Sequence, residues 1–300
     1  MKYILYNSQA GEGTCESEAR ILEVIYDEVE FIDMKRISSY ETFFRGLEDD
    51  AEIILCGGDG TLNRFVNETQ NIEIHNNIYY FSTGTGNDFA RDLGHEKGAN
   101  PDYCINQYLR ELPSVEVNGK KQLFLNNVGF GIDGYCCEVG DKLREQNREN
   151  HRNKPINYTA IAIGGLLFHF KPRNATITVD GKEYTYKKVW LAPTMNGRFY
   201  GGGMMPTPKQ DRLGKDGTVS LMLFHSTGKL RTLMIFPSLF KGTHVKHKKK
   251  VAIFTGKNIT VKFDRPTPLQ IDGETILNVT SYSVSAPIRA ERKAQDLAFT

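Results

Sequence analysis

Cysteine is scarce in this sequence, and no apolar run is long enough to cross a membrane. The five cysteines show no Cys-x-x-Cys spacing and no paired framework, which is typical of a reducing compartment and of a protein without a zinc site. The longest mainly apolar run, Tyr158 to Phe170, falls short of the ~20 residues that span a bilayer. It predicts a buried helix or one that faces lipid. The apolar segment near the N-terminus is too short for a secretory signal.

An excess of charge of either sign is also missing. The 38 basic and 36 acidic residues give a net charge of +2, so the composition indicates neither a nucleic-acid partner nor an acidic tail. We find no internal repeat, low-complexity tract or Pro/Ser-rich linker. A chain of 300 residues is long enough for two ordinary domains, and without a linker they are expected to abut.

Short apolar runs alternate with helical patterns in the first third of the chain. The predicted strands are residues 2–6, 29–33, 52–56 and 78–82, and the predicted helices are residues 16–27, 38–47 and 61–69. Strands that alternate with helices in this way favour βαβ units and a parallel sheet. Functional loops in such sheets lie at the carboxyl ends of the strands.

The pattern changes after about residue 123. Alternation of period two around Asp180-Gly181 predicts a β-hairpin. Further strand-like runs are residues 218–225, 251–256, 259–263, 268–274 and 279–287. We therefore expect an α/β domain at residues 1–125 and a largely antiparallel β domain at residues 126–285. The charged tail at 286–300 is a candidate helix that would pack back on the first domain.

Two glycine-rich loops follow successive predicted strands. In GGDGT, residues 57–61, glycines without a Cβ let backbone N–H groups approach a phosphate, and the helix behind adds the positive end of its dipole. Asp59 would then face a magnesium ion. A lone loop of this kind is more often a plain turn, and a Walker loop is excluded because no Gly-Lys-[Ser/Thr] follows. STGTGNDFAR, residues 82–91, repeats the arrangement with Asp88, and two such loops favour one shared pocket.

Three weaker motifs lie in the second half of the chain. GFGIDG, residues 129–134, matches a dinucleotide fingerprint, but no later strand presents an acid to a ribose, so we interpret its glycines as part of the crossover between domains. Asp211 and Asp216 depart from EF-hand spacing and indicate either a loose cation site or a solvated loop. The basic run at 244–250 is either a solvated face or a contact with anionic lipid.

Taken in order, seven motifs resemble the soluble diacylglycerol kinase family, the lipid kinases that also include sphingosine kinases. They are NSQAG, GGDGTLN, TGTGNDFAR, NNVGFGIDG, NGRFYGGGM, DRLGKDG and QIDGE, and they run from Asn7 to Glu274. Each motif alone is weak, whereas seven in one order are specific. The resemblance implies an N-terminal α/β domain that binds ATP, a C-terminal antiparallel β-sandwich, and an active site in the cleft between them.

The resemblance also assigns site residues. The positions matching the family's nucleotide-binding stretches are Asn7, Ser8, Gly11, Gly57, Gly58, Gly60 and Thr61, with Thr85 beside the phosphates. Asp59 and Asp88 match acids that organise Mg-ATP. A third family acid, an aspartate, falls on Glu116, which departs from the family's pattern. Asp211, Asp216 and the backbone of Thr218 lie where the family holds a structural magnesium ion.

Glu274 matches the residue proposed as the general base of the family, and Asp59 is the second expected catalytic residue. Asp272, two residues earlier, is expected to point the other way in an extended segment and to matter far less.

The expected activity is therefore ATP- and magnesium-dependent phosphorylation of the hydroxyl of a diacylglycerol-like lipid, which yields phosphatidic acid. Positioning and charge neutralisation dominate phosphoryl transfer, so glycines, acids and magnesium suffice without a P-loop lysine. The alternatives are a phosphotransferase like NAD kinase, which shares GGDGT, and a catalytically silent nucleotide- or lipid-binding regulator. We expect a cytoplasmic protein, peripheral to the inner face of the membrane, whose partner is a lipid alcohol and not nucleic acid. A homodimer is compatible with the sequence.

Overall fold

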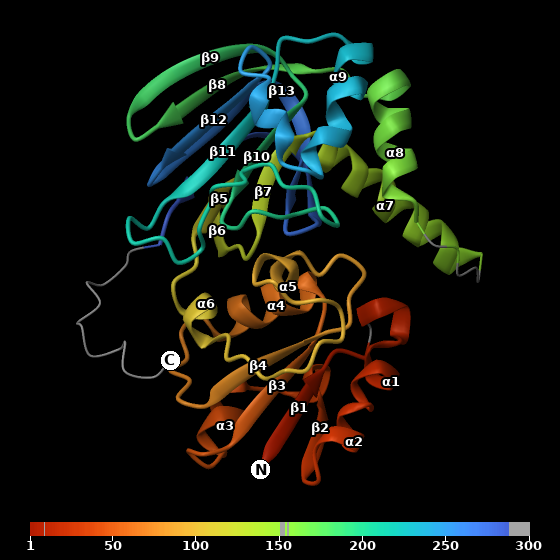
Figure 1. Ribbon diagram of the computed structural model, residues 1–300, viewed down its shortest axis with the longest axis vertical. Coiled ribbons are helices and arrows are strands. Elements are labelled where there is room, and N and C mark those ends of the chain that lie inside the picture. The colour runs from red at the N-terminus through yellow and green to blue at the C-terminus, as the bar shows by residue number, and fades with distance from the viewer. Residues whose placement is uncertain (9, 151–153, 155, 288–300) are drawn as a thin grey trace.

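The structure is a computed structural model that describes residues 1–8, 10–150, 154 and 156–287. It consists of two units, of which the N-terminal one lies at the bottom of Figure 1 and the larger one lies above it. Most of the predicted tail helix, from residue 288 onward, lies outside the described residues.

The N-terminal unit is built on a parallel four-stranded sheet with the strand order β2-β1-β3-β4. The strands are β1 (Lys2–Tyr6), β2 (Val29–Asp33), β3 (Glu52–Gly57) and β4 (Asn77–Ser82). Around them lie η1 (Ala10–Gly13), α1 (Cys15–Ala19), α2 (Leu22–Ile25), η2 (Met34–Arg36), α3 (Tyr40–Arg45), α4 (Asp59–Thr69), α5 (Asp88–Asp92) and α6 (Asn106–Arg110). Each predicted strand is confirmed to within one residue at either end.

Helices cover both faces of this sheet. One apolar cluster joins alternate residues of β1 and β3, such as Leu5 and Leu55, to α3 and α4, and a second joins the intervening residues, such as Ile4 and Ile54, to α1 and α2. The single helix predicted over 16–27 is broken between α1 and α2. The buried residues Cys15, Ala19 and Leu22 nevertheless keep the spacing of one helix face across the break.

The larger unit is an antiparallel β-sandwich, in which every strand pair is antiparallel. Its strands are β5 (Ser114–Val117), β6 (Lys120–Leu123), β7 (Asn127–Gly131), β8 (Arg173–Val179), β9 (Lys182–Val189), β10 (Leu191–Met195), β11 (Val219–Phe224), β12 (Val251–Gly256), β13 (Asn258–Ile271) and β14 (Glu274–Ser285). The main path runs β12-β11-β10-β7-β13-β14-β5-β6, and β8 with β9 branches off β13. One apolar core, which includes Phe130, Phe263 and Tyr282, lies inside.

The β5–β6 hairpin belongs to this larger sheet, although it precedes the boundary expected at residue 125. Glu116 of β5 pairs with Ser283 of β14 on one side and with Lys121 of β6 on the other. The chain therefore passes into the sandwich sheet before it reaches Leu125. The division at 125 and 126 stays a prediction, with this hairpin assigned to the larger sheet by its backbone pairing.

A layer of helices covers one side of the sandwich, at the upper right of Figure 1, and it confirms the helix predicted over residues 158–170, whereas its other members are not predicted from the sequence. Its members are α7 (Ile132–Glu149), α8 (Tyr158–Gly164), the π-helix η3 (Gly165–His169), α9 (Lys229–Ile235), η4 (Phe236–Leu239) and η5 (Thr243–Lys246). They bury a third apolar cluster against β10 and β11, including Leu166, Trp190 and Met222. Within the described part of the chain, no helix has the length and apolar character that a bilayer span requires.

Candidate active site

Three of the predicted loops meet at one edge of the parallel sheet. They follow β1, β3 and β4, which are neighbours in the sheet with Tyr6 beside Cys56 and Cys56 beside Phe81. After β1, the carbonyl of Asn7 accepts the N–H of Ala10 at 2.9 Å, and η1 contains Gly11. Figure 1 shows that this edge faces the sandwich unit. The sequence-predicted nucleotide loops are therefore brought together.

The loops after β3 and β4 touch through two glycines. A Cβ on Gly84 would lie 2.6 Å from the Cα of Gly58, closer than real Cβ atoms approach other atoms. Gly60, by contrast, faces open space, and Thr61 is buried against Gly57. Glycine at 58 and 84 is thus required by the contact between the loops, whereas Gly60 leaves room at the helix start for an approaching group.

Asp59 joins the two loops. Its carboxylate oxygens accept the backbone N–H groups of Asp88 and Phe89, each at 2.9 Å. These are N–H groups of the first turn of α5, which have no partner inside the helix, so Asp59 acts as a cap supplied by another loop. A carboxylate keeps further lone pairs for other donors or a metal. The sequence predicts Asp59 as a catalytic residue of the Mg-ATP site, and this capping role comes in addition.

Asp88 is buried and links the two units. It accepts the N–H of Gly202, in the glycine-rich loop of the sandwich unit, at 2.8 Å and pairs with Arg91 at 3.0 Å. Burial, and next the negative charge of Asp59, raise the pKa of the Asp88 carboxyl to about 7. Thr85, three residues earlier, is exposed on the same loop.

The two carboxylates fit a divalent cation. A Cβ built on Gly86 would lie 3.4 Å from an oxygen of Asp59 and 3.7 Å from one of Asp88, so both carboxylates converge on one place. Burial first, and then repulsion from the like charge of Asp59, raise the pKa of the Asp88 carboxyl. A magnesium ion prefers one or two carboxylates plus substrate phosphates, and this donor set matches that preference.

The β13–β14 turn docks on α4. Asp272 accepts the backbone N–H groups of Asn126 at 2.7 Å and Asn127 at 2.9 Å, a further one from Leu125, and the side-chain amide of Asn63 at 2.6 Å. Burial nevertheless raises the pKa of its carboxyl to about 6. The extended segment expected at Asp272 is instead a turn, and the smaller effect of Asp272 on turnover than that of Glu274 stays a prediction. Asp272 sits in the turn with φ of 47° and fastens the junction between the units.

Glu274 follows on the same turn and is exposed. The pKa of the Arg64 guanidinium is raised, chiefly by its hydrogen bond with Glu68 and in part by the charge of Glu274. Glu274 therefore lies within electrostatic reach of α4. Because α4 begins at Asp59 and a helix rises 1.5 Å per residue, the docking point at Asn63 is about 6 Å along the axis from Asp59.

A buried ion network that the sequence reading missed fixes the remaining loops. Asp92, at the end of α5, pairs with Arg198 at 2.7 Å and with Arg212, and Arg212 also donates to the carbonyl of Leu125 at 2.6 Å. Asp92 and Arg212 are each 4% exposed. Each of these residues stands beside or within one of the seven motifs, but no local pattern marks them as partners.

The predicted structural magnesium site has fewer side-chain ligands in place than a metal site usually has. Asp211 and Asp216 are both exposed, and Asp211 accepts the N–H of Leu213 at 2.9 Å. The carbonyl of Thr218 accepts the side chain of Gln210 at 2.8 Å. Across the described residues, no group of three or more His, Cys, Asp or Glu side chains is placed to hold a metal. This site stays a prediction that two acids and a carbonyl of one loop support.

Glu116 is separate from the glycine-rich loops in the contacts that the structure shows. It is exposed on β5, and no hydrogen bond or ion pair in the described ranges joins it to Asp59 or Asp88. Its assignment to nucleotide binding stays a prediction.

The glycines of the GFGIDG stretch let β7 and the start of α7 approach neighbouring chain segments closely, and the stretch does not cross between the units. A Cβ on Gly131 would lie 2.4 Å from the carbonyl oxygen of Trp190, and one on Gly134 would lie 2.1 Å from that of Pro268. The crossover is made by the segment that Asp272 holds. The motif also contains Asp133, which is buried beside Gln270 at 3.4 Å, and burial raises its pKa to about 6. No expectation from the sequence included Asp133.

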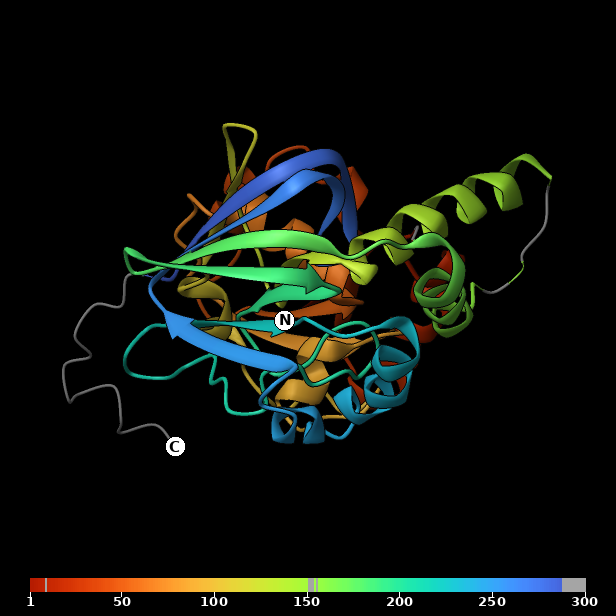
Figure 2. The same cartoon turned by 90° about the horizontal axis from the view of Figure 1, so that it is seen from above.

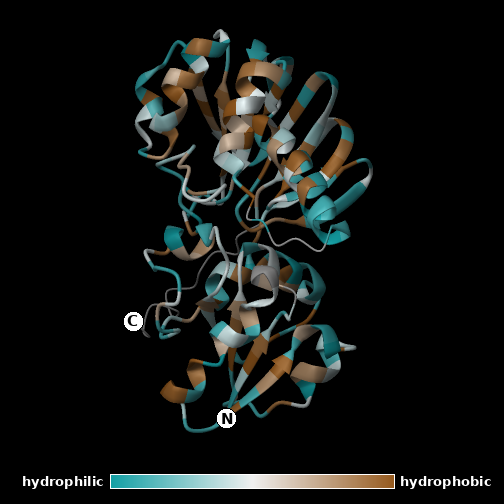
Figure 3. Ribbon diagram, turned by 90° about the vertical axis from the view of Figure 1, so that its right-hand side faces the viewer, coloured by the Kyte–Doolittle hydropathy of each residue, from teal (hydrophilic) through white to brown (hydrophobic). Residues whose placement is uncertain are grey.

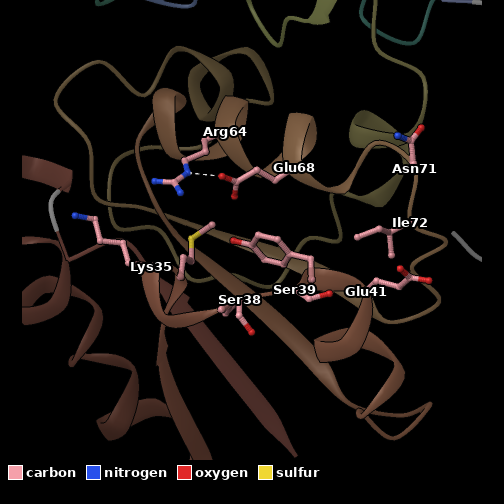
Figure 4. Close-up of a pocket in the computed structure, with 11 residues that line it drawn as sticks. Lys35, Ser38, Ser39, Glu41, Arg64, Glu68, Asn71 and Ile72 are labelled. Carbon is pink, nitrogen blue, oxygen red and sulfur yellow. Dashed lines mark hydrogen bonds and ion pairs between the residues drawn. The ribbon is translucent and has the colours of Figure 1, made fainter.

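A hollow of about 520 Å³ lies between α4 and the segment from η2 to the start of α3 (Figure 4). Lys35, Ser39 and the ion pair of Arg64 with Glu68 line part of it. None of the candidate site residues lines this hollow, so it is distinct from the loops that meet Asp59.

Family comparisons match both halves of the chain. The model of the diacylglycerol kinase catalytic domain matches residues 2–117, and that of the YegS C-terminal NAD kinase beta sandwich-like domain matches residues 126–289. The solved structure of a putative diacylglycerol kinase from Bacillus anthracis str. Sterne has a TM-score of 0.64 at 20% identity, covering 95% of this chain and 91% of that one. This likeness shows the fold.

Curated relatives carry kinase names. A diacylglycerol kinase of Mycobacterium tuberculosis is 27% identical over 64% of this chain, and the match spans 61% of that protein. The putative lipid kinase YtlR of Bacillus subtilis is 24% identical over 78% of this chain and 77% of its own length. A diacylglycerol kinase of the same organism is 26% identical over 74% of this chain and 70% of its own length.

Proposed function

Because this chain belongs to the diacylglycerol kinase family, we propose that it transfers the γ-phosphate of ATP to the hydroxyl of a diacylglycerol-like lipid. The observation that carries the proposal is the docking of the β13–β14 turn on α4. That contact brings the turn that carries Glu274 to the helix that begins at Asp59, which supports a general-base role for its carboxylate in this proposal.

In this proposal the lipid hydroxyl loses its proton to the Glu274 carboxylate as its oxygen attacks the γ-phosphorus. The bond between that phosphorus and the β,γ-bridging oxygen breaks, and ADP leaves with the bond's electron pair. Backbone N–H groups of the loop after β3 and the start of α4 orient the phosphates. Magnesium held by Asp59 and Asp88 would neutralise phosphate charge.

The activity is tested with radiolabelled ATP on mixed micelles that contain diacylglycerol, ceramide, a sphingoid base or undecaprenol, with NAD as a soluble control. We expect label in diacylglycerol and loss of that label in Glu274→Gln. Label in NAD instead would show a phosphotransferase like NAD kinase. No label in any acceptor, with ATP still bound, would show a silent regulator.

A second magnesium ion is proposed at Asp211, Asp216 and the carbonyl of Thr218, remote from the transferred phosphate. Binding to the folded state alone raises stability, so the melting temperature of the wild type should rise with magnesium and that of Asp216→Ala should not. Full activity of Asp216→Ala, together with an unchanged response of its melting temperature to magnesium, contradicts this site.

A further inference from the structure

Helix α9 carries two of the most exposed apolar side chains of the described residues. Leu230 is 74% exposed and Met234 is 81% exposed, and their spacing of four residues places them on one helix face. Phe168 of η3 is also 74% exposed. The ammonium group of Lys229 donates to the carbonyl of Leu167 at 2.6 Å, so η3 and α9 lie side by side, as Figures 1 and 2 show. We call Phe168, Leu230 and Met234 the apolar ridge.

The elements beneath the ridge are firmly packed. On the opposite face of α9, Thr232 and Ile235 are buried, and Ile235 belongs to the apolar cluster that also contains Leu166 of η3. The ridge therefore projects from anchored elements and is not a frayed end. Exposed apolar side chains grouped on anchored helices mark an interaction surface. Figure 3 views the molecule from the side on which these helices lie.

Basic residues predominate on α9 and on the segment that follows it in the sequence, and on α7, which packs against η3, Glu138 and Asp141 pair with Lys142 and Arg144. From residue 217 to residue 263 the chain has nine basic residues and no acidic one. They are Lys229, Arg231, Lys241, Lys246, Lys248, Lys249, Lys250, Lys257 and Lys262. Residues 156–172, which include α8 and η3, carry Lys171 as their only Lys, Arg, Asp or Glu. A surface of this composition is complementary to an apolar layer with a negatively charged boundary.

We propose that the apolar ridge, together with the basic residues of α9 and of residues 241–250, forms the surface that docks on an anionic phospholipid bilayer, with the ridge inserted among the headgroups. The proposal rests on the lipid kinase function proposed above and assigns the face on which the substrate is met. A second copy of the chain would bring two positively charged faces together, which repel each other, so the charge favours the bilayer. Apolar insertion together with cation attraction is how surface helices bind anionic membranes.

A short stretch of chain connects the cluster beneath the ridge with the candidate site. The cluster beneath α9 packs against Met204, and Gly202, two residues earlier, donates its N–H to Asp88. In this proposal, a lipid that leaves the bilayer at the ridge is therefore delivered on the side of the molecule where this stretch meets Asp88. The basic run at 244–250 is one part of this face, and the ridge supplies the part that enters the membrane.

Vesicle sedimentation tests the surface. The wild type should bind vesicles that contain phosphatidylglycerol far better than pure phosphatidylcholine vesicles, and salt should weaken this binding. The variant Phe168→Ser/Leu230→Ser/Met234→Ser should lose about tenfold or more in vesicle partitioning, because it removes three large apolar groups. The matched control is Ile21→Ser/Val24→Ser, at exposed apolar positions of the N-terminal unit next to Glu23, Asp27 and Glu28. It should bind like the wild type.

A second measurement does not depend on the triple variant folding. The only tryptophan, Trp190, is 2% exposed, so Leu230→Trp adds a reporter at the ridge. Its emission should shift to the blue with anionic vesicles and be quenched by brominated lipid. Equal binding to both vesicle types, an unaltered triple variant, or no spectral shift each overturns the proposal. So does a ridge-dependent dimer in size-exclusion chromatography that leaves vesicle binding unchanged.

The test separates docking from catalysis. The ratio of activity on vesicles to activity on a monomeric short-chain diacylglycerol should fall at least tenfold in the triple variant. If the wild type binds anionic vesicles through the ridge yet phosphorylates no lipid, the docking surface stands and the proposed function fails. If it phosphorylates the monomeric lipid but binds vesicles without using the ridge, the function stands and the docking surface fails.

Discussion

Glu274 and Asp272 lie two residues apart on one turn, yet their carboxylates have opposite surroundings. Glu274 is exposed near α4, so Glu274→Gln should lower kcat by ~10² to 10⁴, the range typical of a lost general base. ATP-analogue binding and the melting temperature should stay as in the wild type, because the side chain keeps its shape. Steady-state kinetics with an analogue-binding assay checks this, and near-normal turnover would end the general-base assignment.

Asp272→Asn, unlike Glu274→Gln, should lower the stability of the fold. It replaces a carboxylate oxygen with an amide N–H group that faces N–H donors of Leu125 to Asn127, and a buried unsatisfied donor costs about 1–3 kcal/mol. The melting temperature should therefore fall clearly in Asp272→Asn and not in Glu274→Gln. Equal melting temperatures for the two variants would contradict the role of Asp272 as a fastening.

Asp133 should make stability depend on pH. Its folded-state pKa is about 6, above the usual ~4 of an unfolded chain, so between these values only the folded state holds the proton. The contribution of protonated Asp133 to the free energy of unfolding is therefore fully present below pH ~4, and it is lost as the pH rises through about 6. Asp133→Asn stays neutral, so it should match the wild type at pH 4 and exceed it at pH 8 by up to about 2 kcal/mol. Thermal unfolding at both values checks the sign, and a constant difference would refute it.

At the scale of elements, the contact between the two glycine-rich loops holds the candidate site together. Gly84→Ala places a methyl group against the backbone of Gly58, so it should cost about 1–3 kcal/mol and weaken ATP-analogue binding. Gly60→Ala is the matched control, because its Cβ meets nothing within 4 Å and alanine is the better helix former. It should keep or raise the melting temperature. Two variants of equal stability would show that the loops do not depend on this contact.

The sequence allowed accurate prediction of the parallel sheet, because each strand is a short apolar run followed by a turn. It was less accurate for the helices over 132–149 and 229–235. Their apolar residues contact β10 and β11, and the intervening glycines and charged residues hide the helical period. Both glycine-rich loops were predicted as neighbours, because parallel strands place their carboxyl ends together.

The partners of the site residues could not be predicted in this way. Asn63 and Asp272 form a hydrogen bond although 209 positions separate them, and Asp92 meets Arg212 across 120 positions. An acidic residue in a turn has the same neighbours in the sequence whether its carboxylate accepts backbone N–H groups from a distant segment or faces water. The local sequence therefore predicts neither the backbone contacts of Asp272 nor the cap that Asp59 provides for α5.

At the scale of the whole molecule, the network around Asp92 holds the units in their relative positions. Arg212→Met removes one partner of a buried carboxylate, which should cost about 3 kcal/mol or more and expose the segment at 125–127 to proteases. Arg45→Met, which removes an exposed pair with Glu41, should cost at most about 1 kcal/mol. Thermal unfolding with limited proteolysis measures both. Similar losses in the two variants would show that the interface does not depend on this network.

The β5–β6 hairpin has a consequence for how the protein is made. Its residues leave the ribosome early, but its partner β14 is among the last described strands to be synthesised. At ~5–20 residues per second, the hairpin waits roughly ten seconds or more with its edge open. During that interval the N-terminal unit folds without it, and Glu116 has no neighbour in β14. The edge of β5 is therefore paired only once β14 has been synthesised, which makes the appearance of β14 the event that seals this part of the larger sheet.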